Sequence, residues 1–380
     1  MGRESTRRTL VVLHPVFALT GVMHAIGGPL LPSLVATFHL DDRQSGLLFL
    51  LYFGGTSLGA LLCRANYARA MAIGFGAAAI ACLFVTSADW PLLLVAFLLL
   101  GISVGMPMAS VSLFTGRAFP QSNASVLTAL NFTWSAGALL APLLAARVLV
   151  SHTYRFAYAG LALAAVCAAL LCAAFLRDSP EAVPTSSTRT QLASLRLIII
   201  FALAAFLEVG IENTSVAWLP TYALRTAHQG VVFAVASTSI YWVGFLASRG
   251  LSALLLLRVR AVVLFRICVG IALIAGSVLT LTPSLALRNT AIFLLGAGLG
   301  PIFPLLLSQF FSLASHTSQS RWILASAGFG GSVLPWLAGV ISAATGTIRT
   351  GILVIPAALL VMLLIVSVGA HHTDPRISEG

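Results

Sequence analysis

The stretch LEVGIENTSVAWLPTY, Leu207 to Tyr222, places two glutamates inside a long apolar run. A charged side chain at the centre of a bilayer costs about 2.5–3.5 kcal/mol, so such residues usually face the interior of a helix bundle or a wet cavity. Glu208 and Glu212 are four residues apart, which puts both carboxyl groups on one face of a helix. Asn213 and Trp218 follow closely. We therefore predict that this segment forms one wall of a transport site, for which the rest of the chain is a scaffold.

The composition is that of a membrane protein. Of the 380 residues, 59% are hydrophobic and 8% are charged, and apolar runs of spanning length recur along the chain. The formal net charge of +11 would suggest nucleic acid as the partner of a soluble protein. Here the basic residues, all of them arginine, cluster in loops between apolar runs, as topology signals do. We therefore expect the lipid bilayer, and no nucleic acid, as partner.

Twelve segments of spanning length predict an all-α membrane protein. The predicted helices cover roughly residues 10–37, 44–63, 70–88, 91–115, 123–149, 154–176, 194–222, 230–256, 261–282, 285–311, 320–345 and 350–370. A polar stretch separates the first six from the second six. We predict an N-terminal six-helix half over residues 1–176, a cytoplasmic linker over 177–193 and a C-terminal six-helix half over 194–380.

The arginines predict the orientation of these helices. With the N-terminus in the cytoplasm, most of the 21 arginines fall on the inner side, and the outer side keeps Arg43, Arg147, Arg155, Arg225, Arg288 and Arg349. Positive charge is enriched in cytoplasmic loops, so both termini are predicted to be cytoplasmic. The first apolar run is too long for the core of a cleaved signal peptide and is interpreted as a retained helix. We expect an integral protein of the bacterial cytoplasmic (inner) membrane.

No enzymatic signature stands out in the chain. The five cysteines lie in or at the ends of apolar segments without metal-ligand spacing, which favours buried small hydrophobes. We find no Ser-His-Asp set, zinc spacing or nucleotide-binding loop. The sequence therefore predicts a protein that is not an enzyme, with no cofactor and no metal.

The two halves repeat one another. Tyr52-Phe53-Gly54-Gly55 matches Tyr241-Trp242-Val243-Gly244, and three further matches follow at nearly the same offset. They pair Leu31-Pro32-Ser33 with Leu219-Pro220-Thr221, Gly101 and Gly105 with Gly296 and Gly300, and Gly137 and Pro142 with Gly330 and Pro335. Six helices separate the matches, so matched helices run in the same direction. Parallel six-helix repeats are the plan of the major facilitator superfamily, in which the substrate site lies near the midplane between the halves.

Within that superfamily the chain resembles the fucose permease-like sugar:proton symporters. The resemblance is carried by Val209-Gly210-Ile211-Glu212 with Trp218-Leu219-Pro220-Thr221-Tyr222, by Gln44-Ser45-Gly46-Leu47-Leu48-Phe49, by Leu130 to Ala138 with Pro142, by Tyr241 to Gly244 with Arg249, by Gly300-Pro301-Ile302-Phe303-Pro304, and by Gly328, Gly330, Gly331 and Pro335-Trp336. It implies sugar transport coupled to protons. A monomer is the family expectation.

Two acidic positions of that family are missing here. The resemblance implies an Asp in the first helix and a Glu in the fourth for proton coupling, and the matching positions are Gly28 and Met108. Coupling must then use Glu208 and Glu212 or be absent. In a partly dry cavity, burial and mutual repulsion favour a proton on at least one of these carboxyls, so the pair is a candidate proton carrier. The alternative is a structural ion pair with an arginine.

Amide and aromatic side chains in both halves have the chemistry of a sugar site. An amide offers donors and an acceptor to hydroxyl groups, and an aromatic ring offers an apolar surface to a pyranose. The predicted substrate-binding residues are His24, Asn131, Trp134, Glu212, Asn213, Trp218, Tyr241, Trp242 and Gln309. For His24 the alternative is a buried histidine with its hydrogen bonds satisfied, and for each aromatic it is packing or interface anchoring.

The leading hypothesis is a secondary active transporter that moves a monosaccharide of the hexose type by alternating access, with proton symport through the glutamates of the seventh helix. Three alternatives stay open at this point. They are a sugar facilitator without proton coupling, an exporter of drugs or other small solutes from the same superfamily, and a membrane receptor or scaffold that does not transport.

Overall fold

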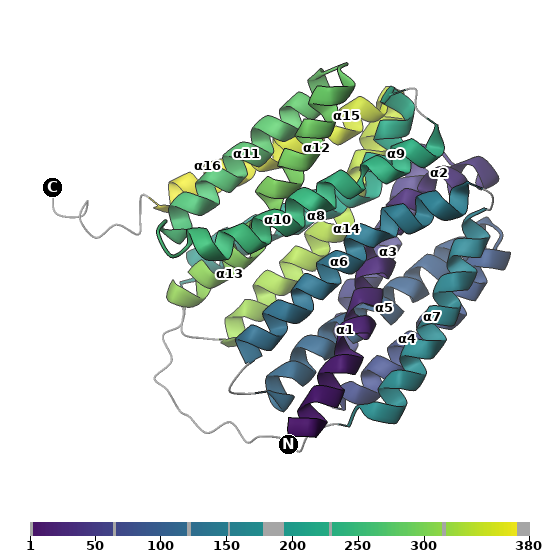
Figure 1. Cartoon of the computed structure of the whole chain (residues 1–380). Helices are drawn as coiled ribbons and strands as arrows, with labels where there is room; N and C mark the ends of the chain where they lie inside the picture. The colour runs from purple at the N-terminus through teal and green to yellow at the C-terminus, as the bar shows by residue number, and fades with distance from the viewer. Residues whose placement is uncertain are drawn as a thin grey trace. The chain divides into compact units, whose positions relative to one another are not determined.

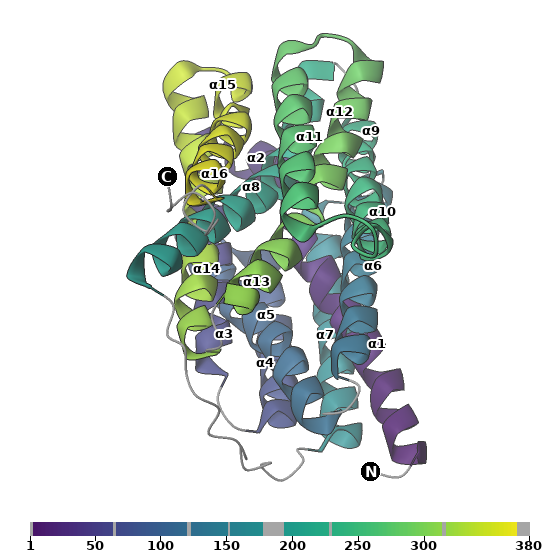
Figure 2. The same ribbon diagram turned by 90° about the vertical axis from the view of Figure 1, so that its left-hand side faces the viewer.

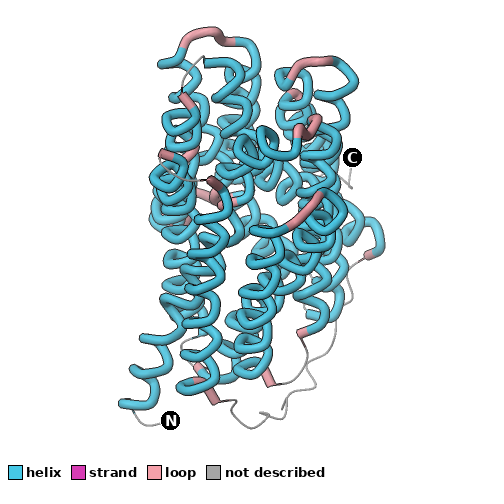
Figure 3. The backbone as a smooth tube through the Cα atoms, turned by 90° about the vertical axis from the view of Figure 1, so that its right-hand side faces the viewer, coloured by secondary structure: helices cyan, strands magenta, loops and turns pink. Residues whose placement is uncertain are grey.

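The computed structural model describes residues 3–63, 66–119, 123–150, 153–177, 194–227, 230–313 and 317–370. Every regular element within these ranges is an α-helix (Figure 3). Eleven helices of the described residues are long and apolar enough to cross a membrane. The remaining predicted span is α8, a continuous helix of 33 residues that carries Glu208 and Glu212. The prediction of an all-α membrane protein is therefore confirmed.

The helices of the first half of the chain, labelled in Figure 1, are α1 (Arg3–Ala25), α2 (Gly27–Phe38), α3 (Asp42–Leu62), α4 (Tyr67–Ser87), α5 (Trp90–Ala118), α6 (Asn123–Leu149) and α7 (Tyr154–Phe175). Those of the second half are α8 (Leu195–Ala227), α9 (Val231–Ser237), α10 (Ser239–Leu255), α11 (Ala261–Leu281), α12 (Leu285–Leu299), α13 (Ile302–Leu313), α14 (Thr317–Thr345), α15 (Ile348–Ile352) and α16 (Val354–Ala370). Residues 178–193 of the predicted linker lie outside the described residues.

Four of the predicted spans are interrupted helices. The first consists of α1 and α2, the eighth of α9 and α10, the tenth of α12 and α13, and the twelfth of α15 and α16. Between α1 and α2 the sequence is Ile26-Gly27-Gly28-Pro29, and between α12 and α13 it is Gly300-Pro301. Proline has no N–H to donate to the preceding turn, and glycine weakens a helix interior, so both sequences loosen the backbone locally. The interruptions are short, since the N–H of Leu30 still donates to the carbonyl of Ile26 at 3.1 Å.

By its contacts the chain divides into two compact units, and the division falls inside α8. Unit 1 comprises Met1–Thr185 and Val216–Ser239, and unit 2 comprises Ser186–Ser215 and Ile240–Gly380. In unit 1, α3 packs against α5, α4 against α5 and α7, and α1 against α6 (Figure 2). In unit 2, α11 packs against α12 and α16, and α14 against α15.

Each unit contains the same close crossing of two helices. In unit 1, a Cβ atom on Gly101 of α5 would collide with the backbone carbonyl of Tyr52 in α3. In unit 2, a Cβ atom on Gly296 of α12 would collide with the carbonyl of Tyr241 in α10. These are the residues that the repeat pairs in the sequence. Glycine is required at both crossings because the backbones approach too closely for any side chain.

Candidate functional site

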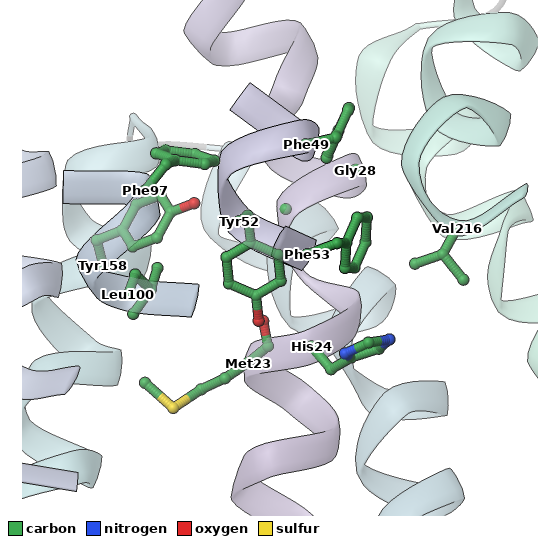
Figure 4. Close-up of a pocket in the computed structure, with 11 residues that line it drawn as sticks. Met23, His24, Gly28, Phe49, Tyr52, Phe53, Phe97, Leu100, Tyr158 and Val216 are labelled. Carbon is green, nitrogen blue, oxygen red and sulfur yellow. The ribbon is translucent and has the colours of Figure 1, made fainter. Parts of the chain in front are cut away.

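Unit 1 contains a small aromatic pocket beside His24 (Figure 4). His24 lies in the last turn of α1, just before the helix interruption at Ile26, and Gly27 and Gly28 line the same pocket. The ring centroid of His24 is 5.3 Å from that of Phe53 and 5.3 Å from that of Trp134. His24 is 9% exposed and Trp134 7%. Two predicted binding residues, from α1 and α6, are thus brought together.

Other lining residues of this pocket escaped the sequence analysis. Tyr52 and Phe53 of α3 and Tyr158 of α7 face the same space as His24. The hydroxyl of Tyr52 donates a hydrogen bond to the carbonyl of Met23 at 2.8 Å, which fixes the ring beside the end of α1. Tyr52 could have been found from the sequence, because the internal repeat pairs it with Tyr241, a predicted substrate-binding residue.

The pocket is closed in this structure. It has room for about one water molecule, far less than a hexose needs. One of its walls is Val216, which follows the division point of α8 and belongs to unit 1. A solute can therefore reach His24 and Trp134 only after neighbouring helix segments have moved apart.

Asn131 and Trp134 differ in their surroundings. The two residues are three positions apart on α6, yet Asn131 is exposed whereas Trp134 is buried. The neighbouring Thr133 accepts or donates a hydrogen bond with His14 of α1 at 2.7 Å, so the polar surface of α6 continues towards α1 at that level.

Unit 2 holds both glutamates in its interior. Glu208 is fully buried and Glu212 is 8% exposed. Neither carboxyl oxygen of Glu208 has a hydrogen-bond partner among the described residues, and the same is true of the buried hydroxyl of Tyr241 in α10. The charges of Glu208, Glu212 and Arg249 interact with one another and with Tyr241. These four residues, of which Arg249 is half-buried and the others buried, form a polar cluster that we call the α8–α10 cluster.

Arg249 is the cation of this cluster, and sequence reasoning missed that role. Its Nε donates to the carbonyl of Gly300 at 3.0 Å, and its guanidinium lies 4.3 Å from the ring centre of Phe245. Its charge acts on both Glu208 and Glu212. Arg249 is therefore the arginine that the alternative interpretation of the glutamates, a structural ion pair, would involve.

The remaining predicted residues have mixed surroundings. Asn213 donates from Nδ2 to the carbonyl of Gly331 in α14 at 3.0 Å, which joins the two helices. Trp218 belongs to unit 1 and lies 5.9 Å from the ring of Phe49 in α3. Trp242 packs edge to face on Tyr241 at 5.3 Å. Gln309 is half-buried on α13.

Gly28 explains why the acid expected in the first helix has no place here. A Cβ atom at this position would lie 2.9 Å from the carbonyl oxygen of Ala217 and even closer to that of Val216, both in α8. An aspartate cannot enter without separating α2 from α8. No group of three or more His, Cys, Asp or Glu side chains that could hold a metal ion is found in the part of the chain that the structure describes.

Residues 13–323 match the family model of the Major Facilitator Superfamily. The chain belongs to this superfamily. The predictions of a transporter rather than an enzyme, and of an integral membrane protein, are thereby confirmed.

The individual transporters that are similar to this chain have low sequence identity to it. The chain is 27% identical over 367 residues to a glucose/galactose transporter of Brucella abortus, a match that covers 89% of this chain and 88% of the relative. It is 24% identical over 361 residues to the glucose/mannose transporter GlcP of Bacillus subtilis, covering 88% of both. Its fold is similar to the crystal structure of the fucose:proton symporter FucP of E. coli, with a TM-score of 0.65 at 19% identity over 95% of this chain and 98% of that one.

Proposed function

We propose that this superfamily member carries a monosaccharide of the hexose type across the membrane by alternating access. The observation that carries the proposal is the similarity to two transporters named for hexoses, which extends over 88% of each relative. The aromatic pocket beside His24, whose ring contacts that of Trp134, supports it, because ring faces and an imidazole suit the apolar and hydroxyl surfaces of a pyranose.

The proposed sugar contacts are the residues predicted from the sequence. In unit 1 they are His24, Trp134 and Trp218, with the exposed amide of Asn131 at the edge. In unit 2 they are Glu212, Asn213, Tyr241, Trp242 and Gln309. Asn213 has a structural role in addition, since its Nδ2 already donates to Gly331.

We further propose that transport is symport with protons through the α8–α10 cluster. Two carboxyl groups and one guanidinium carry one negative charge in excess when all three are ionised. A buried excess charge is costly, so the cluster is best accommodated with one bound proton shared by Glu208 and Glu212. Loss of that proton to the other side of the membrane would couple one proton to each transport cycle.

We also propose that the protein lies in the bacterial inner membrane with both termini in the cytoplasm. We propose that it works as a monomer. The arginine distribution supports the orientation. A reporter that matures only in the cytoplasm, fused to either end of the full chain, should be active. An inactive fusion that is present in the membrane would reverse the assignment.

Uptake of labelled glucose, galactose and mannose into proteoliposomes, with and without an imposed inward proton gradient, tests the function. Symport predicts accumulation above equilibrium that requires the gradient. Glu208→Gln and Glu212→Gln should abolish accumulation, whereas Asp89→Asn should not, because Asp89 is an exposed acid that caps α5 and asparagine caps equally well. Absence of uptake of all three sugars would refute the proposal.

A sugar facilitator without proton coupling is the second candidate. Gly28 and Met108 stand where the related symporters are expected to have acids, and the crossing at Gly28 leaves no space for one. This candidate predicts sugar equilibration that is indifferent to the proton gradient and to both glutamate variants. The same uptake assay therefore separates the two.

A further inference from the structure

We propose that the outer segment of α8, Val216–Ala227, is a movable wall of the His24 pocket that is held closed by the ion pair between Asp42 and Arg225. "Outer" refers to the side of the membrane that the arginine distribution predicts for this end of the helix. The proposal concerns access to the pocket and does not depend on which solute is carried.

The ion pair has the geometry of a strong, directional contact. One terminal nitrogen of Arg225 donates to Oδ2 of Asp42 at 2.7 Å, and the other donates to Oδ1 at 2.7 Å. Two parallel bonds between a guanidinium and a carboxylate fix both distance and orientation. The side chain of Asp42 is 10% exposed and that of Arg225 is 37% exposed, so water screens the pair in part.

Both partners stand at helix ends that favour their charges. Asp42 is the first residue of α3, where the N-terminal end of the helix dipole favours an anion, and Arg225 lies in the last turn of α8, where the C-terminal end favours a cation. Asp42 is not needed as a cap. Asp41 accepts from the N–H of Gln44 at 2.7 Å, and Gln44 accepts from the N–H of Asp41 at 3.0 Å. The carboxylate of Asp42 is therefore available for Arg225.

The outer segment of α8, which carries Arg225, forms one wall of the pocket. Val216, at its start, lines the pocket next to Gly28 and Phe49. Trp218 packs edge to face on Phe49, with ring centroids 5.9 Å apart. Three contacts thus follow one another along α8 towards its outer end. They are the close approach at Gly28, the ring contact at Phe49 and the ion pair at Asp42.

The wall is part of a helix that both units share. Residues 195–215 of the same continuous helix belong to unit 2, whereas Val216–Ser239 pack with unit 1. The outer segment is thus joined covalently to one unit and held to the other by side chains. Because the pocket has room for about one water molecule, a solute enters only if a wall of the pocket moves, and we assign that movement to this segment. The Asp42–Arg225 pair is the charged contact that must break for this movement.

Labelling of a cysteine at Val216 by a membrane-impermeant maleimide tests the proposal in the full chain without any sugar. The five native cysteines are first replaced, and Val216→Cys is added as the reporter. Asp42→Asn and Arg225→Gln should each speed labelling by up to about fivefold, and the double variant should do no more than either single one, because one contact is lost in all three. Arg43→Gln is the matched control, since it removes an exposed charge next to Asp42 without touching the pair.

A second measurement keeps the proposal testable where a variant folds poorly. A reducible bifunctional methanethiosulfonate cross-linker that joins Asp42→Cys to Arg225→Cys spans the longer distance of this pair. The cross-link should protect the reporter from the maleimide, and a reductant should restore labelling. Unchanged labelling in both single variants, additive effects in the double variant, or equal labelling with the cross-link formed and reduced would overturn the proposal. Labelling as expected in a protein that takes up no hexose would leave the movable wall standing and refute only the proposed sugar function.

Discussion

Gly28 offers the sharpest test of how the pocket is closed. Replacing it by alanine puts a methyl carbon 2.9 Å from the carbonyl oxygen of Ala217, 3.1 Å from its Cα, and closer still to the carbonyl of Val216. All three are backbone atoms, so no side-chain rotation relieves the contact. Forcing extra atoms into a packed contact costs about 1–3 kcal/mol. We expect Gly28→Ala to shift the equilibrium from the closed to the open pocket by about 5–150-fold.

The neighbouring glycine is a matched control. A Cβ atom on Gly27 would meet only Cε1 of Phe49, at 3.6 Å, which is ordinary van der Waals contact. Both substitutions gain about 0.5–1 kcal/mol of helix stability from replacing glycine. This gain is common to the open and closed states and cancels in their ratio. Gly27→Ala should therefore leave the closed state in place and raise the thermal stability slightly.

The assay is maleimide labelling of the Val216→Cys reporter, with thermal unfolding in detergent as a check of folding. Gly28→Ala should label faster, and Gly28→Asp, which restores the acid found in related symporters, should label faster still without gaining proton coupling. The reasoning is refuted if Gly28→Ala labels and melts like Gly27→Ala.

Three further outcomes follow from individual contacts. Asn213→Ala removes the buried hydrogen bond to α14 and should lower the free energy of unfolding by about 1–3 kcal/mol. Substitution of the exposed residue, Asn131→Ala, should leave the melting temperature unchanged and weaken sugar binding instead. Equal melting curves for the two variants would contradict this. Glu212→Gln should abolish accumulation driven by a proton gradient and leave exchange of labelled sugar intact, and undiminished accumulation would exclude Glu212 from coupling. Tyr52→Phe loses the 2.8 Å bond to α1 and should cost about 0.5–1.5 kcal/mol of stability, which chemical denaturation measures.

Local features of the chain were enough to predict the class of fold. Apolar runs of spanning length predict helices because a bilayer leaves no other partner for backbone N–H and C=O groups. The repeat was also readable, and Gly101 and Gly296 have equivalent contacts in the two units. The position of the acids on one face of α8 needed only the helical period.

The residues that surround each candidate side chain could not be predicted from the sequence in the same way. The ring of His24 contacts that of Trp134, and the charge of Arg249 acts on Glu208. Asn213 donates a hydrogen bond to the backbone of α14. Each of these pairs joins different helices. Which side chains meet there depends on how the helices cross, and an apolar helix of this kind shows little periodicity that would indicate its contact face.

The sequence by itself determined the spans, the six-plus-six repeat and the placement of two carboxyls inside an apolar helix, because hydropathy and helical period are local properties. Only the tertiary structure decided that α8 divides between two units, that its outer segment closes the His24 pocket, and that Asp42 pairs with Arg225, 183 residues away. The physical reason is that such contacts arise from the packing of whole helices, whose mutual register no short stretch of sequence contains.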